Sequence, residues 1–201
     1  MSALVAILRR DGAPADPAVA RAALEAQRAR GPEARRVWSE GPAAIGHGLL
    51  ATTPEDDLAP QPFSAAGGAV VVALDGRLDN TAELAEATGL RESGTSDVEL
   101  VAAAYAKWGA TFAHRLLGDF AIVLWDARRR EMLCARDPLA SRPLYVRADH
   151  RVVLCASEPR ALFRAAARAT GAIAPTGAGS ATGTGAIAEA GDARQPRIDA
   201  E

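Results

Sequence analysis

The stretch 70–80 constrains the fold more than any other part of this chain. Five consecutive apolar residues beginning at Val70 are typical of a strand that is covered on both faces. Asp75-Gly76 is a turn dipeptide, because glycine adopts positive φ at no steric cost. Asp79 or Asn80 can then cap a helix. The order predicts a strand, a sharp turn and a helix start, where exposed N–H groups can bind a ligand; a plain connection is the simpler interpretation.

Length and composition favour one domain with a substantial core. The chain has 201 residues, of which 49% are hydrophobic, and a formal net charge of −2. Such a weak negative charge argues against a nucleic-acid or anionic-membrane partner. No basic start is followed by an apolar signal segment, and no apolar run is long enough to span a membrane. We therefore expect a cytoplasmic protein.

The sequence predicts neither a metal site nor a disulfide framework. Cys134 and Cys155 each lie in an apolar, strand-like run, which is typical of small buried core residues. His47, His114 and His150 are scattered without metal-ligand spacing. No cofactor is expected.

The pattern of apolar residues predicts two stacked antiparallel sheets with helices outside, an α/β (α+β) layered sandwich of αββα type. The first strand begins almost at the N-terminus, and the late strands are joined by short, hairpin-like links. We expect strands at 3–8, 36–39, 43–51, 70–74, 119–126, 131–135, 143–147 and 151–156, the last four as a meander, and helices at 16–29, 80–89, 97–108, 110–117 and 158–167.

The C-terminal part of the chain differs in composition. Residues 170–191 consist mostly of Gly, Ala, Thr and Ser, which is typical of a flexible linker or tail. Gly177-Ala178-Gly179-Ser180 is no phosphate-binding loop, because no Lys follows it and no strand precedes it. We therefore divide the chain into one domain, 1–168, and a low-complexity, disordered tail, 169–201.

Several short stretches, in the correct order, resemble one family. The chain is similar to the N-terminal glutaminase-type domain of the asparagine synthetase B family, the class II glutamine amidotransferases of the N-terminal-nucleophile (Ntn) hydrolase fold. The resemblance covers roughly the first four-fifths of the chain. The matching stretches are 1–5, 30–32, 46–47, 61–62, 74–80, 96–99, 117–126, 135–139, 142–145 and 156–158.

The resemblance implies a pocket with named positions. In the family, a Cys exposed by removal of the initiator Met attacks glutamine with its own α-amine as base; here that position holds Ser2. The family's arginine for the glutamine carboxylate falls at Leu49 or its neighbour, and its Asn-Gly-Glu falls on Asp75-Gly76-Arg77. Asp97 matches the family's aspartate for the glutamine amine, although an N-cap role explains Asp97 equally well.

These substitutions predict a degenerate glutaminase. Serine is a weaker nucleophile than cysteine at neutral pH, and Leu49 cannot bind a carboxylate. An ionised Asp75 accepts hydrogen bonds and cannot donate one to an oxyanion. The pattern resembles the N-terminal domains of lasso-peptide cyclases and β-lactam synthetases, which form amide bonds with a separate synthetase domain.

Three interpretations remain open at this point. The first is a non-catalytic scaffold or partner-binding domain of an asparagine-synthetase-related amide-forming system, acting with a separate ATP-dependent synthetase-domain protein, because this sequence has no Ser-Gly-Gly-x-Asp-Ser loop. The second is an Ntn amidohydrolase or glutamine amidotransferase with Ser2 as nucleophile. The third is a truncated gene product.

Overall fold

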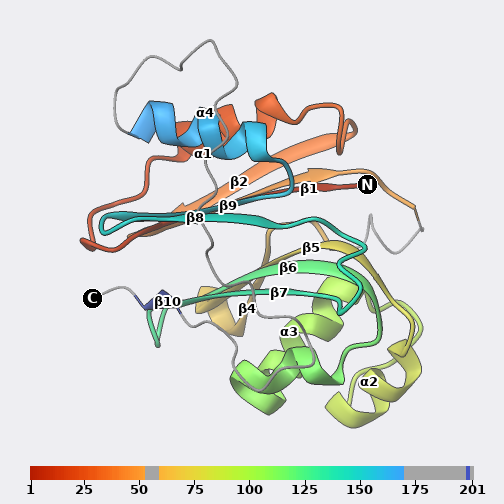
Figure 1. The fold of residues 1–201 in the computed structure, drawn as a ribbon. Helices are drawn as coiled ribbons and strands as arrows, with labels where there is room; N and C mark the ends of the chain where they lie inside the picture. Colours follow the sequence, from red (N-terminus) through yellow and green to blue (C-terminus); the bar gives the residue numbers. More distant parts are fainter. Residues whose placement is uncertain (53–58, 170–197, 200–201) are drawn as a thin grey trace.

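The protein is a sandwich of two five-stranded antiparallel sheets with helices on both outer faces (Figure 1). The computed structural model describes residues 1–52, 59–169 and 198–199. The first sheet has the order β2-β3-β1-β9-β8 and the second β10-β7-β6-β5-β4. In the first sheet the strands are β2 (Ala34–Glu40), β3 (Ala43–Leu49), β1 (Ala3–Arg9), β9 (Val152–Ala156) and β8 (Tyr145–Ala148); in the second they are β10 (Ile198–Asp199), β7 (Glu131–Arg136), β6 (Gly118–Asp126), β5 (Val70–Leu78) and β4 (Phe63–Ala65).

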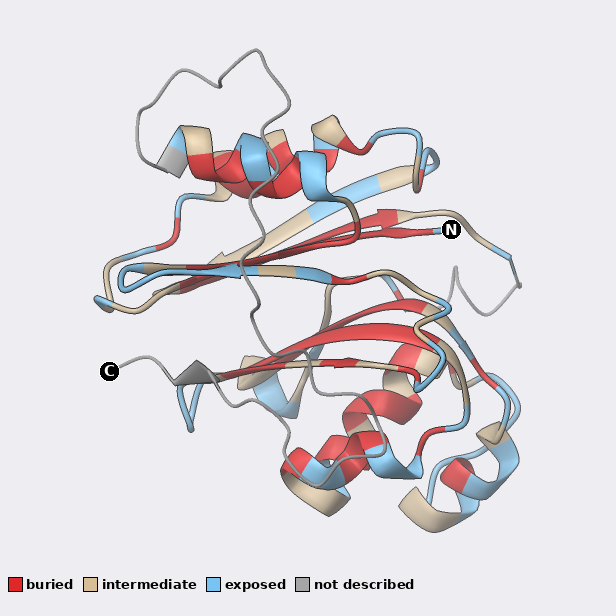
Figure 2. Ribbon diagram, viewed as in Figure 1, coloured by how far each residue is buried: buried red, intermediate tan, exposed pale blue. Residues whose placement is uncertain are grey.

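Three apolar layers hold the four layers of secondary structure together (Figure 2). One lies between the first sheet and helices α1 (Pro17–Ala26) and α4 (Pro159–Ala169), and one between the two sheets. The third lies between the second sheet and α2 (Thr81–Thr88) and α3 (Asp97–Trp108). Both faces of the central strands are therefore buried, as their apolar sequences predicted. The αββα architecture is confirmed.

The chain begins inside the fold, as its apolar N-terminus predicted. Strand β1 lies between β3 and β9, with Ala3 opposite Gly48 and Val5 opposite both Gly46 and Ala156. The side chains of Ala3 to Leu8 are at most 2% exposed. Residues just before β1 are therefore held in place by the sheet.

Strand β5 corrects our expectation for Asp75-Gly76. These residues do not form a turn, because β5 continues through them to Leu78 and pairs with β6 along its whole length. Gly76 is needed for close packing: its φ is +143°, and a Cβ at this position would lie 1.9 Å from the carbonyl oxygen of Asp119. Gly118 is in the reciprocal position, where a Cβ would lie 2.2 Å from the oxygen of Arg77.

The late strands do not form one meander. Strands β6 and β7 belong to the second sheet and β8 and β9 to the first, so the chain crosses between the sheets after Arg136. The Asp137 carboxylate organises this crossing by accepting hydrogen bonds from the backbone N–H groups of Phe120, Leu139, Ser141 and Arg142. A short link between strands predicts an antiparallel hairpin, but it cannot tell a hairpin from a change of sheet.

The remaining boundaries differ from the predicted ones by a few residues. Helix α1 ends at Ala26, and 109–115 forms a 3-10 helix in place of the expected α-helix. Another short 3-10 helix covers 66–68. The predicted tail lies outside the described residues, except for β10, which pairs with β7. Within the described segments, no helix is long and apolar enough to cross a membrane.

The close approach of β5 and β6 makes Gly76 intolerant of a side chain. We expect Gly76→Ala to lower the free energy of unfolding by about 2–4 kcal/mol, because the added methyl overlaps backbone and the positive φ adds strain. Gly89→Ala is a matched control, since Gly89 has a φ of +76° but open space around it; it should cost about 1 kcal/mol. Urea unfolding measures both, and equal losses would contradict a steric role for Gly76.

The crossing at Asp137 should make stability depend on pH. Burial raises the pKa of Asp137, but the hydrogen bonds from the backbone outweigh it, so its pKa lies below the usual range. The ionised form therefore stabilises the fold above the unfolded pKa of about 4, and this stabilisation is lost as pH falls through the lower folded pKa.

We expect Asp137→Asn to cost about 2 kcal/mol at pH 7, because an amide has only one oxygen to replace two acceptors. The difference in the free energy of unfolding between wild type and variant should narrow as the pH falls below about 4. Urea unfolding at several pH values measures it. A gap that is the same at every pH would show that the charge of Asp137 does not contribute.

Candidate functional site

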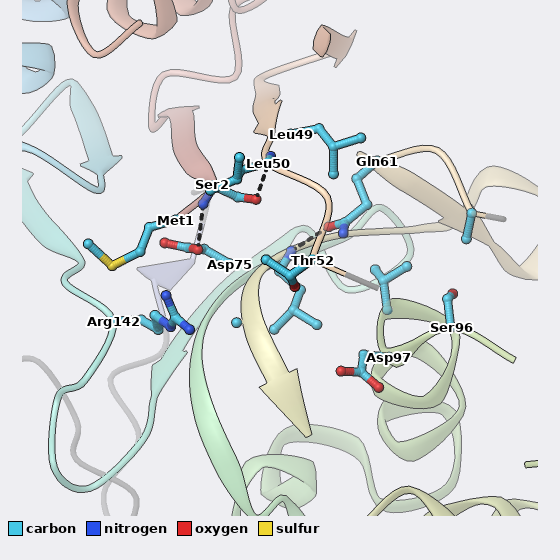
Figure 3. A pocket seen from close by; sticks show the side chains of 14 residues that line it. Met1, Ser2, Leu49, Leu50, Thr52, Gln61, Asp75, Ser96, Asp97 and Arg142 are labelled. Carbon is cyan, nitrogen blue, oxygen red and sulfur yellow. Dashed lines mark hydrogen bonds between the residues drawn. The ribbon is translucent and has the colours of Figure 1, made fainter. Parts of the chain in front are cut away.

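A small pocket opens at the end of the sandwich where β1 begins and β3 ends (Figure 3). Its volume is about 50 Å³. Both sheets and helix α3 contribute to it, so the packing of the sandwich brings distant parts of the sequence together. The described residues that line it are Met1, Ser2, Leu49, Leu50, Thr52, Ala59, Gln61, Leu74, Asp75, Gly76, Ser96, Asp97, Val98 and Arg142.

Ser2 lies in the pocket immediately before β1. Its backbone N–H donates a hydrogen bond to Oδ1 of Asp75 at 2.9 Å. Its Oγ accepts a hydrogen bond from the backbone N–H of Leu50 at 3.1 Å. Ser2 is 8% exposed, and its hydroxyl is held at the pocket wall by the N–H of the residue that follows β3.

Arg30 joins Ser2 and Asp75 through its guanidinium group. Its Nε donates to the carbonyl oxygen of Ser2 at 3.0 Å, and its Nη2 lies 2.9 Å from Oδ2 of Asp75. The side chains of Arg30 and Asp75 are 11% and 2% exposed. Both oxygens of the Asp75 carboxylate are therefore occupied by N–H donors in a buried ion pair.

The environment of Asp75 contains opposing electrostatic effects. Burial raises the pKa of Asp75, whereas the charges of Arg30 and Arg142 and the N–H of Ser2 oppose that rise. The net pKa is above the usual range. At neutral pH we assign the ionised form, because a protonated carboxyl group would give up one of the two hydrogen bonds that it accepts.

The other predicted positions divide into two groups. Leu49, Gly76 and Asp97 line the pocket together with Ser2 and Asp75. Arg77 is not among the residues that line the pocket, because near the end of β5 its side chain is 61% exposed and lies 2.9 Å from Asp79. The structure thus brings together all of the predicted site residues except Arg77.

Asp97 has a structural role as well as a place in the pocket. Its Oδ2 accepts a hydrogen bond from the backbone N–H of Leu78, at the end of β5. The N-cap of α3 is Ser96, and the carboxylate of Glu99 accepts from both the N–H and the Oγ of Ser96. Asp97 is therefore the first residue of the helix and not its cap.

Sequence reasoning gave no site role to Arg142 or Arg30. Figure 3 shows Arg142 beside Met1 and Asp75. Its Nε is buried without a hydrogen-bond partner among the described residues. Both arginines lie in stretches that carry the family resemblance, but only the packed structure shows that they approach Asp75.

Two further contacts fix the wall of the pocket. Oε1 of Gln61 accepts from the backbone N–H of Leu74 at 2.7 Å. Nε2 of the buried His47, in β3, lies 3.2 Å from the carbonyl oxygen of Leu74, in β5, and so connects the two sheets next to the site. Among the residues that the structure describes, no three His, Cys, Asp or Glu side chains group as metal ligands.

The sandwich has the fold of a solved amidotransferase. A solved structure of glutamine phosphoribosylpyrophosphate amidotransferase from Bacillus subtilis superposes with a TM-score of 0.64 at 22% identity, over 82% of this chain and 43% of that one. This likeness shows the fold.

The chain belongs to the glutamine amidotransferase domain family, whose model matches residues 1–175. It is 30% identical to glutamine-hydrolysing asparagine synthetase 3 of Bacillus subtilis over 138 residues, 67% of this chain and 22% of that protein. It is 34% identical to amidase chry2 of Gibberella zeae over 138 residues, 64% of this chain and 20% of that protein. The chain thus matches about a fifth of the length of these relatives.

The buried ion pair should dominate the stability of the site. We expect Arg30→Gln to lower the free energy of unfolding at pH 7 by about 2–4 kcal/mol, because it leaves the Asp75 carboxylate buried without its counter-charge. In an Asp75→Asn background the same substitution should cost clearly less. Urea unfolding of the two single variants and the double variant measures this coupling.

Arg35→Gln is a matched control for Arg30→Gln. Arg35 lies 3.4 Å from Glu25, but these side chains are 35% and 57% exposed. The Arg35→Gln substitution should lower the free energy of unfolding by less than about 0.5 kcal/mol. Additive effects of the Arg30 and Asp75 substitutions would contradict the assigned pairing.

Proposed function

We propose that this domain has lost glutamine hydrolysis and serves as a scaffold or partner-binding unit of an asparagine-synthetase-related amide-forming system. One observation carries the proposal. The carboxylate of Asp75 lies where the family resemblance implies an oxyanion donor, and it is held there by Ser2 and Arg30.

The contact between Ser2 and Asp75 argues against catalysis at two points. If the initiator Met is removed, the Ser2 nitrogen becomes an α-amine 2.9 Å from a carboxylate oxygen. A carboxylate at that distance favours the ammonium form, which cannot take a proton from the serine hydroxyl. The same carboxylate repels the negative charge that would develop on a substrate carbonyl oxygen.

The lining of the pocket supports the same conclusion. Leu49 offers no charge to a glutamine carboxylate, although Gly76 and Asp97 match the family pattern. Lasso-peptide cyclases and β-lactam synthetases, which the sequence resembles, suggest amide formation without ammonia. On this proposal a separate ATP-dependent synthetase-domain protein is the partner, and the domain contributes its surface.

A second candidate function rests on the hydroxyl of Ser2. Ser2 and Arg142 both line the pocket, and the Nε of Arg142 has no hydrogen-bond partner among the described residues. On this second candidate, Ser2 would attack an amide other than glutamine, as an Ntn amidohydrolase. An acylating amide probe followed by mass spectrometry distinguishes the candidates. An adduct on Ser2 favours the enzyme, whereas the absence of an adduct on a chain with a free Ser2 argues against it.

The proposal predicts no glutamine hydrolysis by the purified protein. Ammonia release from glutamine should equal that of the Ser2→Ala variant, because the nucleophile, its base and the oxyanion donor are all compromised. The triple variant Ser2→Cys/Leu49→Arg/Asp75→Asn restores the three family residues and should release ammonia above the wild-type background. Ser2→Cys alone is the control and should stay inactive, because Asp75 remains.

Ammonia release by the wild type that disappears in Ser2→Ala would overturn the proposal. Intact mass spectrometry of each sample shows whether Met1 is present, so an inactive sample with unprocessed Met1 is recognised. The processed N-terminus can then be produced with a methionine aminopeptidase before the assay is repeated.

A further inference from the structure

The two cysteines meet across the interface between the sheets. Cys134 lies in β7 of the second sheet and Cys155 in β9 of the first. Their Sγ atoms are 3.4 Å apart, although the residues are 21 positions apart in the sequence. Both are free thiols that pack in the apolar layer between the sheets.

The two sulfur atoms are close enough for a modest movement to bring them within bonding distance. A disulfide has an S–S distance of about 2.05 Å, so the two atoms must approach by roughly 1.4 Å. Side-chain rotation and small strand shifts can supply part of such a movement. The expectation that the two cysteines are unrelated core residues is therefore incomplete.

We propose that Cys134 and Cys155 are a reversible disulfide site, formed by a small hydroperoxide, that covalently joins the two sheets. The proposal does not depend on whether Ser2 is catalytic. Neither thiol lines the pocket around Ser2.

The difference in exposure between the two thiols determines which of them is oxidised first. Cys134 is partly exposed, whereas Cys155 is 1% exposed. The hydrogen bond with Cys134 and burial raise the pKa of the Cys155 thiol. Cys134 therefore reacts with the oxidant first, and Cys155 stays a thiol until its neighbour is oxidised.

The reaction balances with hydrogen peroxide as the oxidant. The sulfur of Cys134 attacks one peroxide oxygen, an S–O bond forms, the O–O bond breaks, and the displaced hydroxide leaves as water with the thiol proton. The sulfur of Cys155 then attacks the sulfur of the Cys134 sulfenic acid. An S–S bond forms, the S–O bond breaks, and the hydroxyl group leaves as a second water with the Cys155 proton. The two thiols lose two electrons in total, which reduce the peroxide.

The disulfide would enclose the crossing between the sheets. The closed loop contains Asp137 and Arg142, of which the second lines the pocket. The bond would also join the sheet that follows Ser2 to the sheet that carries Asp75. Oxidation would therefore limit relative movement of the two walls of the site.

Peroxide treatment of the folded, full-length protein tests the proposal. After removal of peroxide with catalase, the protein is unfolded, free thiols are alkylated, and the unreduced peptides are mapped by mass spectrometry. We expect one intramolecular link between the peptides of Cys134 and Cys155, with loss of both alkylations, and recovery of both thiols with dithiothreitol. The oxidised protein should melt about 5–10 °C above the reduced one.

Single substitutions test the order of reaction. In Cys155→Ala, Cys134 should accumulate a sulfenic acid that dimedone labels. In Cys134→Ala, Cys155 should remain unlabelled in the folded protein. If a variant does not fold, the wild type with a short peroxide exposure and dimedone gives the same information, because label should appear on Cys134 only.

In the folded protein, the proposal would be overturned by two alkylated thiols after treatment, by oxidation of Cys134 beyond the sulfenic acid without a link, or by a link between two chains. A link that forms only when the protein is oxidised in denaturant would overturn it as well, because the folded geometry would then play no part.

Discussion

The site depends on the buried contact of Asp75 with the Arg30 guanidinium and the Ser2 backbone. It joins the residue that precedes β1, in one sheet, to the middle of β5, in the other. A buried carboxylate is costly without a counter-charge, so Arg30 is as much a part of this arrangement as Asp75. Asp75 also places a hydrogen-bond acceptor in the pocket, at a position where the family resemblance implies a donor.

The sequence was a good guide to the layers and a weaker guide to the connections. Strands that are apolar on both faces predicted two packed sheets, and the apolar start of the chain predicted that β1 is an inner strand. Asp75-Gly76 misled us, because the dipeptide is compatible both with a turn and with a close contact between strands. Only the partner strand, β6, decides between them. The crossing at Asp137 was missed for a similar reason, since a link of that length fits either topology.

The candidate site was predictable where the family resemblance fixes a position along the chain. Ser2, Leu49, Gly76 and Asp97 come together as that resemblance implied. Arg77 lies two residues after Asp75, and alternation places both on the same face of β5, so the pattern did not predict that Arg77 lies outside the pocket. The approach of Arg142 to Asp75 and of Cys134 to Cys155 requires the stacking of two sheets, which no local pattern in the sequence encodes.

The reciprocal glycines Gly76 and Gly118 have a consequence for the register of β5 against β6. Each leaves room for the backbone of the facing strand, so a slip of β5 against β6 by one residue would force a side chain into that room. The register of β5 is thus fixed next to Asp75 itself and not by the length of the connection through α2 and α3. A change in the length of that connection would therefore leave the pairing of β5 with β6 unchanged.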